Sequence, residues 1–258
     1  MLRPRITPCL LVHKGGLVKT IGFKTPKYVG DPINAVKIFN EKEADELIVL
    51  DIDATVNNVE LDYRMIANLA AECRMPLCYG GGIKTPAQAK RIISLGVEKV
   101  AISSAAVEHP ELITQTADEI GRQSVVVVLD VKKRLFSKDY DVCIKNARTN
   151  TNRSVFDLAA EAEKLGAGEL VINSIDLDGA MTGYDLALAE KIRQAVNIPI
   201  SILGGAGSLD DIEALIRTCG VIGASAGSLF VFKGVYKAVL INYPTLVQRD
   251  ELIRRAFC

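Results

Sequence analysis

Eight short, almost continuously apolar runs alternate along the chain with longer segments whose apolar residues recur at helical spacing. The runs cover residues 6–12, 46–52, 75–80, 99–103, 124–130, 169–175, 198–203 and 221–226. Such continuous hydrophobicity is typical of parallel strands that are covered on both faces. Helices are expected to begin at Asp31-Pro32, Thr85-Pro86, His109-Pro110 and Ser208, where a capping residue or a proline precedes an apolar period. The pattern predicts a single α/β domain, residues 1–258, folded as a (β/α)8 TIM barrel; a doubly wound open sheet is the alternative.

The second half of the chain repeats features of the first. ELIVLDID begins at residue 46 and ELVINSID at residue 169, and the glycine pairs at 81–82 and 204–205 keep the same offset. After one inserted residue, Gly96 corresponds to Gly220. Chance similarity between two strand–helix units is the alternative, but anchors in constant register favour a barrel built from two half-barrels.

Composition excludes several classes of partner. Lys and Arg together number 31, as do Asp and Glu, so no overall field attracts nucleic acid or an anionic membrane. Six cysteines form no CxxC pair, the only histidines are His13 and His109, and no window approaches 18 apolar residues. We expect a cytoplasmic protein with reduced thiols, without a signal peptide, membrane span, metal or other cofactor.

Two strands are followed by glycine-rich segments that suit anions. YGGGIKT (79–85) follows the third run and LGGAGS (203–208) the seventh, and the next strand in each case ends in small residues, ISSAA (102–106) and SAGSLF (225–230). Free backbone N–H groups at such ends favour phosphate. Tight turns also use glycine, so the duplication carries the argument. It predicts two phosphate sites that face each other across the barrel mouth.

Carboxylates and lysines also gather where the strands end. Aspartates at 51, 53, 130, 176 and 178 follow strands, where they either act as general acids and bases or simply cap helices. The segment 13–30 is longer than usual and contains lysines at 14, 19, 24 and 27. We interpret it as a lid that brings positive charge to a phosphorylated substrate; a solvated lysine-rich loop is the alternative.

Charges of both signs stand at the opposite ends of the strands. Two cations and two anions occupy these starts: Arg5, Glu46, Lys99 and Glu169. Inward-facing charges there need pairing, because burial of an unpaired charge is costly. They either form a compensated ring across the barrel floor or are ordinary exposed charges.

The ordered motifs resemble a known family over essentially the whole chain. PCLLV, VGDPINAVKIFNEKEADELIVLDIDA, YGGGIKT, GVEKVAISSAAVEHPELI, LGAGELVINSIDLDGAMTGYD and GGAGS resemble the cyclase subunit of imidazole glycerol phosphate synthase. The resemblance implies a (β/α)8 barrel with two phosphate sites. It also implies a glutaminase partner on the barrel floor, whose ammonia travels through the barrel, and a setting in histidine biosynthesis.

The resemblance assigns roles residue by residue. Asp130 becomes one of two catalytic aspartates, Lys19 a supporting lysine, and Asp51 and Asp178 further active-site carboxylates. One phosphate site would use Gly82, Ser103 and Ser104, and the other Gly179, Gly205, Gly227 and Ser228. The charged gate for ammonia would consist of Arg5, Glu46, Lys99 and Glu169.

One position departs sharply from the family. The first catalytic aspartate should follow PCL, and Leu11 stands there. A leucine cannot transfer a proton. His13, two positions later and by strand alternation on the same side, is a candidate replacement base, although a loop histidine without a role is the simpler interpretation. Further departures at the mouth are Leu203, Asn173, Ala180 and Ser103.

Three functions follow as alternatives. In the leading one, the chain is a synthase subunit of a glutamine-dependent amidotransferase and delivers ammonia for acetamidino formation on a nucleotide sugar of surface lipopolysaccharide. In the second, it is an authentic cyclase. In the third, it is a catalytically silent barrel that activates a glutaminase.

Overall fold

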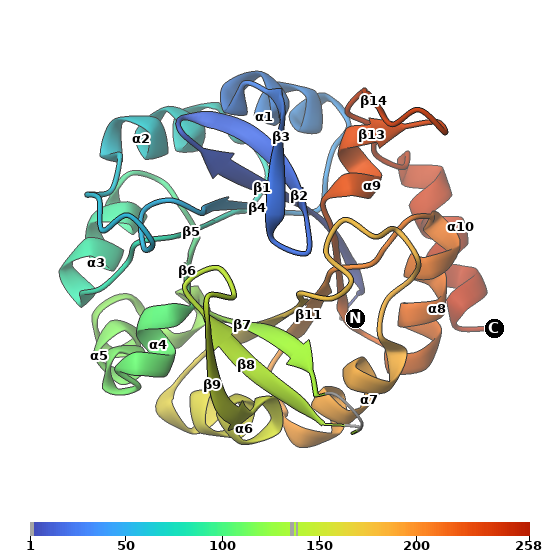
Figure 1. Ribbon diagram of the computed structural model, residues 1–258. Helices are drawn as coiled ribbons and strands as arrows, with labels where there is room; N and C mark the ends of the chain where they lie inside the picture. Colours follow the sequence, from blue (N-terminus) through green and yellow to red (C-terminus); the bar gives the residue numbers. More distant parts are fainter. Residues whose placement is uncertain (1–2, 135–136, 138) are drawn as a thin grey trace.

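Eight parallel strands close into a barrel in the computed structural model, which describes residues 3–134, 137 and 139–258. In barrel order these strands are β1 (Arg5–His13), β4 (Leu47–Asp51), β5 (Leu77–Gly80), β6 (Lys99–Ile102), β7 (Val125–Lys133), β10 (Glu169–Ser174), β11 (Ile200–Leu203) and β12 (Gly223–Ala226). Pairing of β7 with β10 and of β12 with β1 closes the circle (Figure 1). The predicted (β/α)8 barrel is confirmed, and each predicted strand overlaps an observed one.

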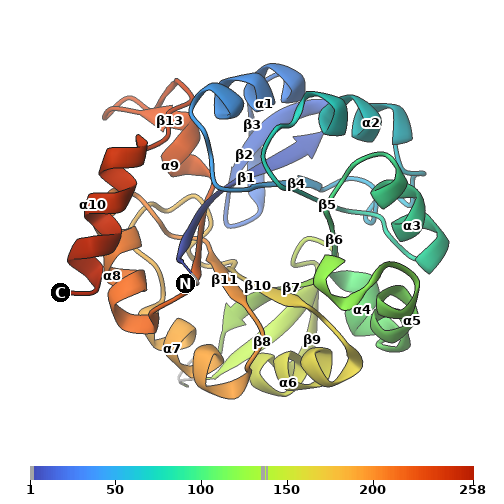
Figure 2. The ribbon, with the colours of Figure 1, turned by 180° about the vertical axis from the view of Figure 1, so that it is seen from behind.

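Helices surround the barrel, as seen from both sides (Figures 1 and 2). They are α1 (Pro32–Glu41), α2 (Tyr63–Glu72), α3 (Pro86–Ser94), α4 (Ser104–Glu108), α5 (Glu111–Ile120), α6 (Val155–Leu165), α7 (Leu186–Ala195), α8 (Leu209–Cys219), α9 (Ser228–Val231) and α10 (Leu246–Ala256), with a 3-10 turn at Arg122–Ser124. Asp31, Thr85 and Ser208 cap their helices through the side chain as the sequence predicts. Helix α5 begins after Pro110 without a side-chain cap.

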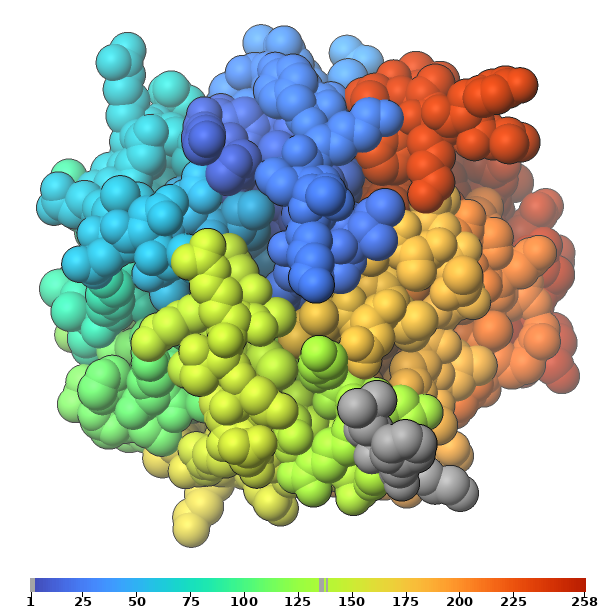
Figure 3. Space-filling model, in the orientation of Figure 1, coloured from blue at the N-terminus to red at the C-terminus, as the bar shows by residue number. Residues whose placement is uncertain are grey.

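Two antiparallel hairpins, which the hydrophobic pattern did not predict, lie over the barrel mouth. Strands β2 (Gly16–Ile21) and β3 (Lys24–Gly30) form the first, so the segment interpreted as a loop is mostly paired strand. Strands β8 (Tyr140–Ile144) and β9 (Thr149–Ser154) form the second. They follow β1 and β7, half a barrel apart. Figure 3 shows both hairpins meeting the segment after β10 over the barrel centre. A third, small hairpin joins β13 (Phe232–Lys233) and β14 (Ala238–Val239).

Two apolar cores divide the side chains of each barrel strand. Ile6 and Leu10 of β1 belong to the large core between strands and helices. Cys9, with Leu11 packed beside it, belongs to a smaller core inside the barrel. Because strand side chains alternate, Arg5 and Thr7 face the barrel interior as well. No helix within the described ranges is long and apolar enough to span a membrane.

Candidate active site and its connection to the barrel floor

The four charged residues at the strand starts form a closed ring of ion pairs across the barrel floor. Arg5 contacts Glu46 at 2.7 Å and Glu169 at 2.6 Å. Lys99 contacts the same carboxylates at 2.7 and 2.8 Å. Both carboxylates are buried, with side-chain exposures of 5% and 7%. We call Arg5, Glu46, Lys99 and Glu169 the floor ring.

The alternation of sign in the floor ring favours the charged forms of Arg5, Lys99 and Glu169. Burial alone would lower the pKa of Arg5 and of Lys99, but Glu169 and Glu46 raise both pKa values above their ordinary range. Burial alone would raise the pKa of Glu169, but Arg5 and Lys99 hold it below its ordinary value. Ser201 adds a hydrogen bond by donating its hydroxyl to Glu169 Oε1 at 2.9 Å. The ring is therefore a polar, charged closure of the barrel bottom.

A second network fixes the strand starts that carry the floor ring. Asp45 accepts a hydrogen bond from the Ile6 backbone N–H at 2.9 Å and pairs with Arg249 of α10. Tyr243 donates its hydroxyl to the Ile6 carbonyl at 2.7 Å and accepts from the Asp45 N–H at 3.2 Å. Arg249 is only 1% exposed. Ile6 and Asp45 are the chain neighbours of Arg5 and Glu46, so α10 holds two members of the floor ring in place.

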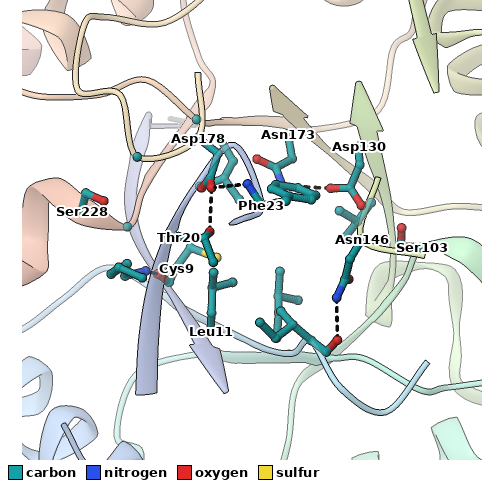
Figure 4. A pocket seen from close by; sticks show the side chains of 18 of the residues that line it. Cys9, Leu11, Thr20, Phe23, Ser103, Asp130, Asn146, Asn173, Asp178 and Ser228 are labelled. Carbon is teal, nitrogen blue, oxygen red and sulfur yellow. Dashed lines mark hydrogen bonds between the residues drawn. The ribbon is translucent and has the colours of Figure 1, made fainter. Parts of the chain in front are cut away.

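At the opposite end, the strand ends and hairpins surround a cavity of about 1110 Å³, its open mouth included. Its walls carry most of the predicted site residues: Lys19, Asp51, Ser103, Ser104, Asp130, Asp178, Gly179, Gly205, Gly227 and Ser228. Figure 4 shows several of these side chains around the opening. His13 and Gly82 are not among the lining residues. The structure thus brings ten of the predicted residues to one cavity.

Asp130, on the cavity wall at β7, has the properties of a proton-transferring group. Burial raises its pKa to about 7, with Asp178 adding to the rise and hydrogen bonds from Asn173 and Ser103 opposing it. Asn173 Nδ2 donates to Asp130 Oδ1 at 2.9 Å (Figure 4). A carboxyl whose pKa lies near neutral pH exchanges a proton most readily under physiological conditions.

Lys19 reaches the cavity from the first hairpin. Its ammonium donates to the Cys9 carbonyl at 2.5 Å and is buried. Burial lowers the pKa of Lys19, while Cys9 and Asp178 act in the opposite direction. A Cβ on Gly227 would lie 2.5 Å from Lys19 Nζ, so the glycine leaves room for the lysine.

Asp178 binds the first hairpin down over the cavity. Its Oδ2 accepts from the Thr20 hydroxyl at 2.6 Å and from the Phe23 N–H at 3.1 Å (Figure 4). Gly179 packs against the same hairpin, because a Cβ there would lie 2.1 Å from the Thr20 carbonyl oxygen. The hairpin is thus held in a closed position, with Phe23 among the cavity-lining residues.

The first predicted phosphate site is partly occupied by internal hydrogen bonds. Gly82 N–H donates to Thr55 Oγ1 at 3.1 Å, and Ser104 Oγ accepts from the Lys145 N–H at 2.9 Å. Asp51 accepts from the N–H groups of Asp53 and Ala54 at 2.8 and 3.1 Å. Burial nevertheless raises the pKa of Asp51. Ser103 and Ser104 face the cavity in this region.

The second predicted phosphate site is more open to a ligand. Gly179, Gly205, Gly227 and Ser228 all line the cavity. Among the described residues, the Ser228 hydroxyl makes no side-chain hydrogen bond like that of Ser104 in the first site. Close backbone approach explains Gly205, because a Cβ there would lie 2.1 Å from the Gly183 carbonyl oxygen.

Leu11 lies on the cavity wall, where the family resemblance places a carboxylate. Leu50 and Leu203 line the same cavity, so this part of the wall is apolar. His13 does not take the place of the carboxylate. Its Nδ1 lies 2.8 Å from Asp53 Oδ1, and Asp53 also accepts from the Lys14 N–H at 2.7 Å. These contacts hold His13 at the rim, away from the cavity.

Several cavity residues were missed because they come from the hairpins. Asn146, at the tip of the β8–β9 hairpin, lines the cavity and donates Nδ2 to the Ile52 carbonyl at 2.7 Å. Thr20 and Phe23 come from the first hairpin. The apolar alternation of Tyr140, Val142 and Ile144 is the signal that identifies β8 as a strand.

The described part of the chain contains no group of three or more His, Cys, Asp or Glu side chains arranged to hold a metal ion. The hydroxyls and the buried Lys19 of the cavity suit an organic anion, and three carboxylates, those of Asp51, Asp130 and Asp178, line the same cavity.

Comparison with known proteins agrees with the barrel and its motifs. A family model described as "Histidine biosynthesis protein" matches residues 5–237. The chain is 56% identical to the "Putative imidazole glycerol phosphate synthase subunit HisF" of Leptospira borgpetersenii, covering 98% of this chain and 99% of the relative. It is 57% identical to a Vibrio vulnificus relative whose similar name ends in hisF3, covering 98% and 97%.

The chain is also similar to a relative that is named as a HisF subunit without the word "putative". The "Imidazole glycerol phosphate synthase subunit HisF" of Lactococcus lactis is 43% identical over 89% of both chains. The family match covers the eight barrel strands, the two hairpins over the mouth and the cavity-lining residues. The chain belongs to the histidine biosynthesis protein family, as a barrel of the type found in the HisF subunits of imidazole glycerol phosphate synthase.

Proposed function

We propose that this barrel is the ammonia-accepting synthase subunit of a glutamine-dependent amidotransferase. In this role a glutaminase docks on the floor ring, and the nitrogen reaches a phosphorylated substrate in the mouth cavity. The observation that carries the proposal is the difference in charged groups between the two ends of the barrel. The floor is closed by a ring of two basic and two acidic side chains joined by four ion pairs, and the mouth holds Asp130, a carboxyl whose pKa burial raises to about 7.

The mouth residues have distinct roles in this proposal. Gly179, Gly205, Gly227 and Ser228 hold one phosphate, and Gly82, Ser103 and Ser104 surround the other end of the substrate. Lys19 places a positive charge beside the second group of glycines. Asp130 transfers the proton, and Asp51 and Asp178 orient the substrate and the closed hairpin.

The reaction follows from the apolar wall at Leu11. Ring closure by two carboxylates needs a partner for Asp130, and Leu11 provides none. Amidine formation needs no second carboxylate on that wall: a partner enzyme that uses ATP phosphorylates the amide oxygen of an N-acetyl group, ammonia adds to the carbon, and the oxygen leaves as phosphate. We therefore infer acetamidino formation on a nucleotide sugar for surface lipopolysaccharide as the specific reaction. The setting is the cytoplasm, where glutamine and nucleotide sugars are available.

A second candidate is ring closure itself, as in an authentic cyclase subunit. The pKa of Asp130 near 7 and the 43% identity to the Lactococcus lactis subunit favour it. In that case Asp130 would serve both proton transfers, with a water molecule or the substrate phosphate in place of the missing carboxylate.

Isotope incorporation separates the two functions. The purified chain, with the glutaminase from the same organism, is given [amide-15N]glutamine and either a nucleotide-activated N-acetyl sugar or the family substrate, N′-(phosphoribulosyl)-formimino carboxamide ribonucleotide. Mass spectrometry of the products then identifies the acceptor. Label in the sugar, with the ATP-using partner enzyme present, supports the first function, and labelled imidazole glycerol phosphate supports the second. Label in neither product contradicts both.

A further inference from the structure

The wall of the barrel between floor ring and mouth cavity is not uniform. On each strand that carries a floor-ring residue, the next inward position lies two residues after that residue. On β4, β6 and β10 that position holds Ile48, Ala101 and Val171, all in the inner apolar core. On β1 it holds Thr7. The passage is therefore apolar on three of these strands and polar on the fourth.

Ser225 of β12 places a second hydroxyl beside Thr7. The two residues pair in register on neighbouring strands, and both are 0% exposed. Ser225 stands between Gly223 near the ring and Gly227 on the cavity wall, just as Thr7 stands between Arg5 and Cys9. Both hydroxyls therefore lie at one level of the passage.

Neither hydroxyl has a hydrogen-bond partner among the described residues. Thr7 Oγ1 and Ser225 Oγ are fully buried polar atoms without one, and so is Oδ1 of Asn173 at the mouth. Burying an unpaired hydroxyl costs about 1–3 kcal/mol, and a ligand that pairs with the hydroxyl would remove this cost. These three unpaired polar atoms inside the barrel indicate a route from the floor ring toward Asp130. Asn173, which carries one of them, donates a hydrogen bond to Asp130.

The chemistry of the passage selects a neutral ligand. Valine, alanine, isoleucine and two buried thiols form the rest of the inner wall. Burial raises the pKa of Cys9 to about 11 and that of Cys78 well above its ordinary value, so both stay uncharged. No carboxylate faces the passage at this level among the described residues. An ammonium ion would be unpaired there, whereas ammonia can both donate to and accept from a hydroxyl.

We propose that Thr7 and Ser225 form a hydrogen-bonding station for neutral ammonia, halfway between the floor ring and the cavity. The inference rests on the proposed function and adds two positioning residues to it. Ser201, bonded to Glu169, begins the route, and Asn173 Oδ1 receives the nitrogen beside Asp130. The hydroxyls lower the cost of passage through an otherwise apolar barrel.

The test measures which fraction of the nitrogen in the product comes from glutamine through the barrel. The product is that of the acceptor identified by the isotope experiment above. The complex with its glutaminase receives [amide-15N]glutamine together with unlabelled ammonium chloride. The 15N/14N ratio of the product compares nitrogen delivered through the barrel with nitrogen taken from solution. This ratio is independent of the rate of the chemical step, and so it isolates passage.

For the double variant Thr7→Val/Ser225→Ala, we expect the 15N/14N ratio to fall about fivefold, the size of effect expected from one lost neutral hydrogen bond. Thr7→Ser, which keeps the hydroxyl, should retain the wild-type ratio. Thr116→Val is the matched control. Thr116 lies on α5, outside the barrel interior, and its buried hydroxyl also has no hydrogen-bond partner among the described residues. Thermal melting of each variant verifies that it folds.

Two negative outcomes can be told apart. An unchanged ratio in the folded double variant would overturn the station and leave the proposed function standing. Failure of the wild-type complex to form any product from either nitrogen source would overturn the proposed function and the station with it.

Discussion

The floor and the mouth of this barrel handle charge in opposite ways. On the floor, each carboxylate of the ring contacts two cations, and each cation two carboxylates. At the mouth, Asp130 is bonded to the amide of Asn173, and leucines form the neighbouring wall. The floor therefore stabilises the charged forms of Arg5, Lys99 and Glu169, while at the mouth burial raises the pKa of Asp130 to about 7. Such a division suits a barrel that passes a small molecule inward at one end and reacts it at the other.

The largest effect is expected from removing the titratable group at the mouth. Asp130→Asn keeps the shape and the hydrogen bond to Asn173 but cannot transfer a proton. We expect 15N incorporation from glutamine and from ammonium to fall together by about 10²–10⁴-fold, measured by mass spectrometry.

Asp176→Asn serves as the matched control. Asp176 follows the neighbouring strand β10 and accepts the Lys133 N–H at 3.0 Å, without lining the cavity. A loss of similar size in this variant, or no loss in Asp130→Asn, would contradict the assignment of proton transfer to Asp130.

At the floor, the largest effect is expected on stability. Asp45→Ala leaves the buried guanidinium of Arg249 unpaired, which costs about 3–5 kcal/mol in the free energy of unfolding. Urea denaturation followed by circular dichroism measures the change. The double variant Asp45→Ala/Arg249→Met removes the unpaired charge and should recover most of the loss. If Asp45→Ala alone were as stable as the wild type, the pair of Asp45 and Arg249 would not hold the floor ring in position.

The pH dependence of stability provides a smaller, signed effect. The pKa of Asp130 in the folded chain is about 7, against an ordinary value of 3.8. The folded state therefore holds a proton that the unfolded state releases between about pH 4 and 7, and stability falls as the pH rises through that window. Asp130→Asn does not ionise.

The direction of this pH dependence determines how the stabilities of the wild type and Asp130→Asn differ. Asp130→Asn should gain stability relative to the wild type as the pH rises, reaching roughly 2–4 kcal/mol by pH 8, with little difference near pH 4. Chemical denaturation across this range measures it. A difference that is constant with pH would show that Asp130 titrates normally.

The smallest effect concerns the hairpin over the mouth. Thr20→Val removes the hydrogen bond to Asp178 and should cost about 1 kcal/mol, with faster amide hydrogen exchange confined to β2 and β3. Thr151→Val is the matched control on the other hairpin, where Thr151 donates to the Val142 carbonyl at 2.7 Å. Equal exchange of β2 and β3 in the wild type and in Thr20→Val would contradict the role of Asp178 in closing the hairpin.

The barrel and its two ends were accessible from the sequence for physical reasons. Strands buried on both faces must be continuously apolar, so runs such as 124–130 and 169–175 could be recognised as strands from the sequence. The register of a parallel barrel then places residues before the strands on the floor and those after them at the mouth. Arg5 and Glu46, which are far apart in the chain, lie together for this reason.

The hairpins and the rim were not accessible in the same way. Residues 16–30 and 140–154 mix polar and apolar residues because only some of them, such as Leu17 and Val142, reach the apolar core. Asn146 therefore carried no signal of its position. His13 follows the alternation that points Leu11 inward, yet Asp53 holds it at the rim. Contacts between loops decide such positions, and strand periodicity does not contain them.

The central claim is that the mouth transfers ammonia without closing an imidazole ring. The most direct measurement is the ammonium-dependent turnover of N′-(phosphoribulosyl)-formimino carboxamide ribonucleotide by the wild type and by Leu11→Asp, followed as imidazole glycerol phosphate. We expect wild-type turnover at least about 100-fold below that of the Lactococcus lactis subunit assayed in parallel, since one proton-transferring group contributes at least that much, and a measurable gain in Leu11→Asp. Wild-type turnover equal to that of the Lactococcus lactis subunit would contradict the account.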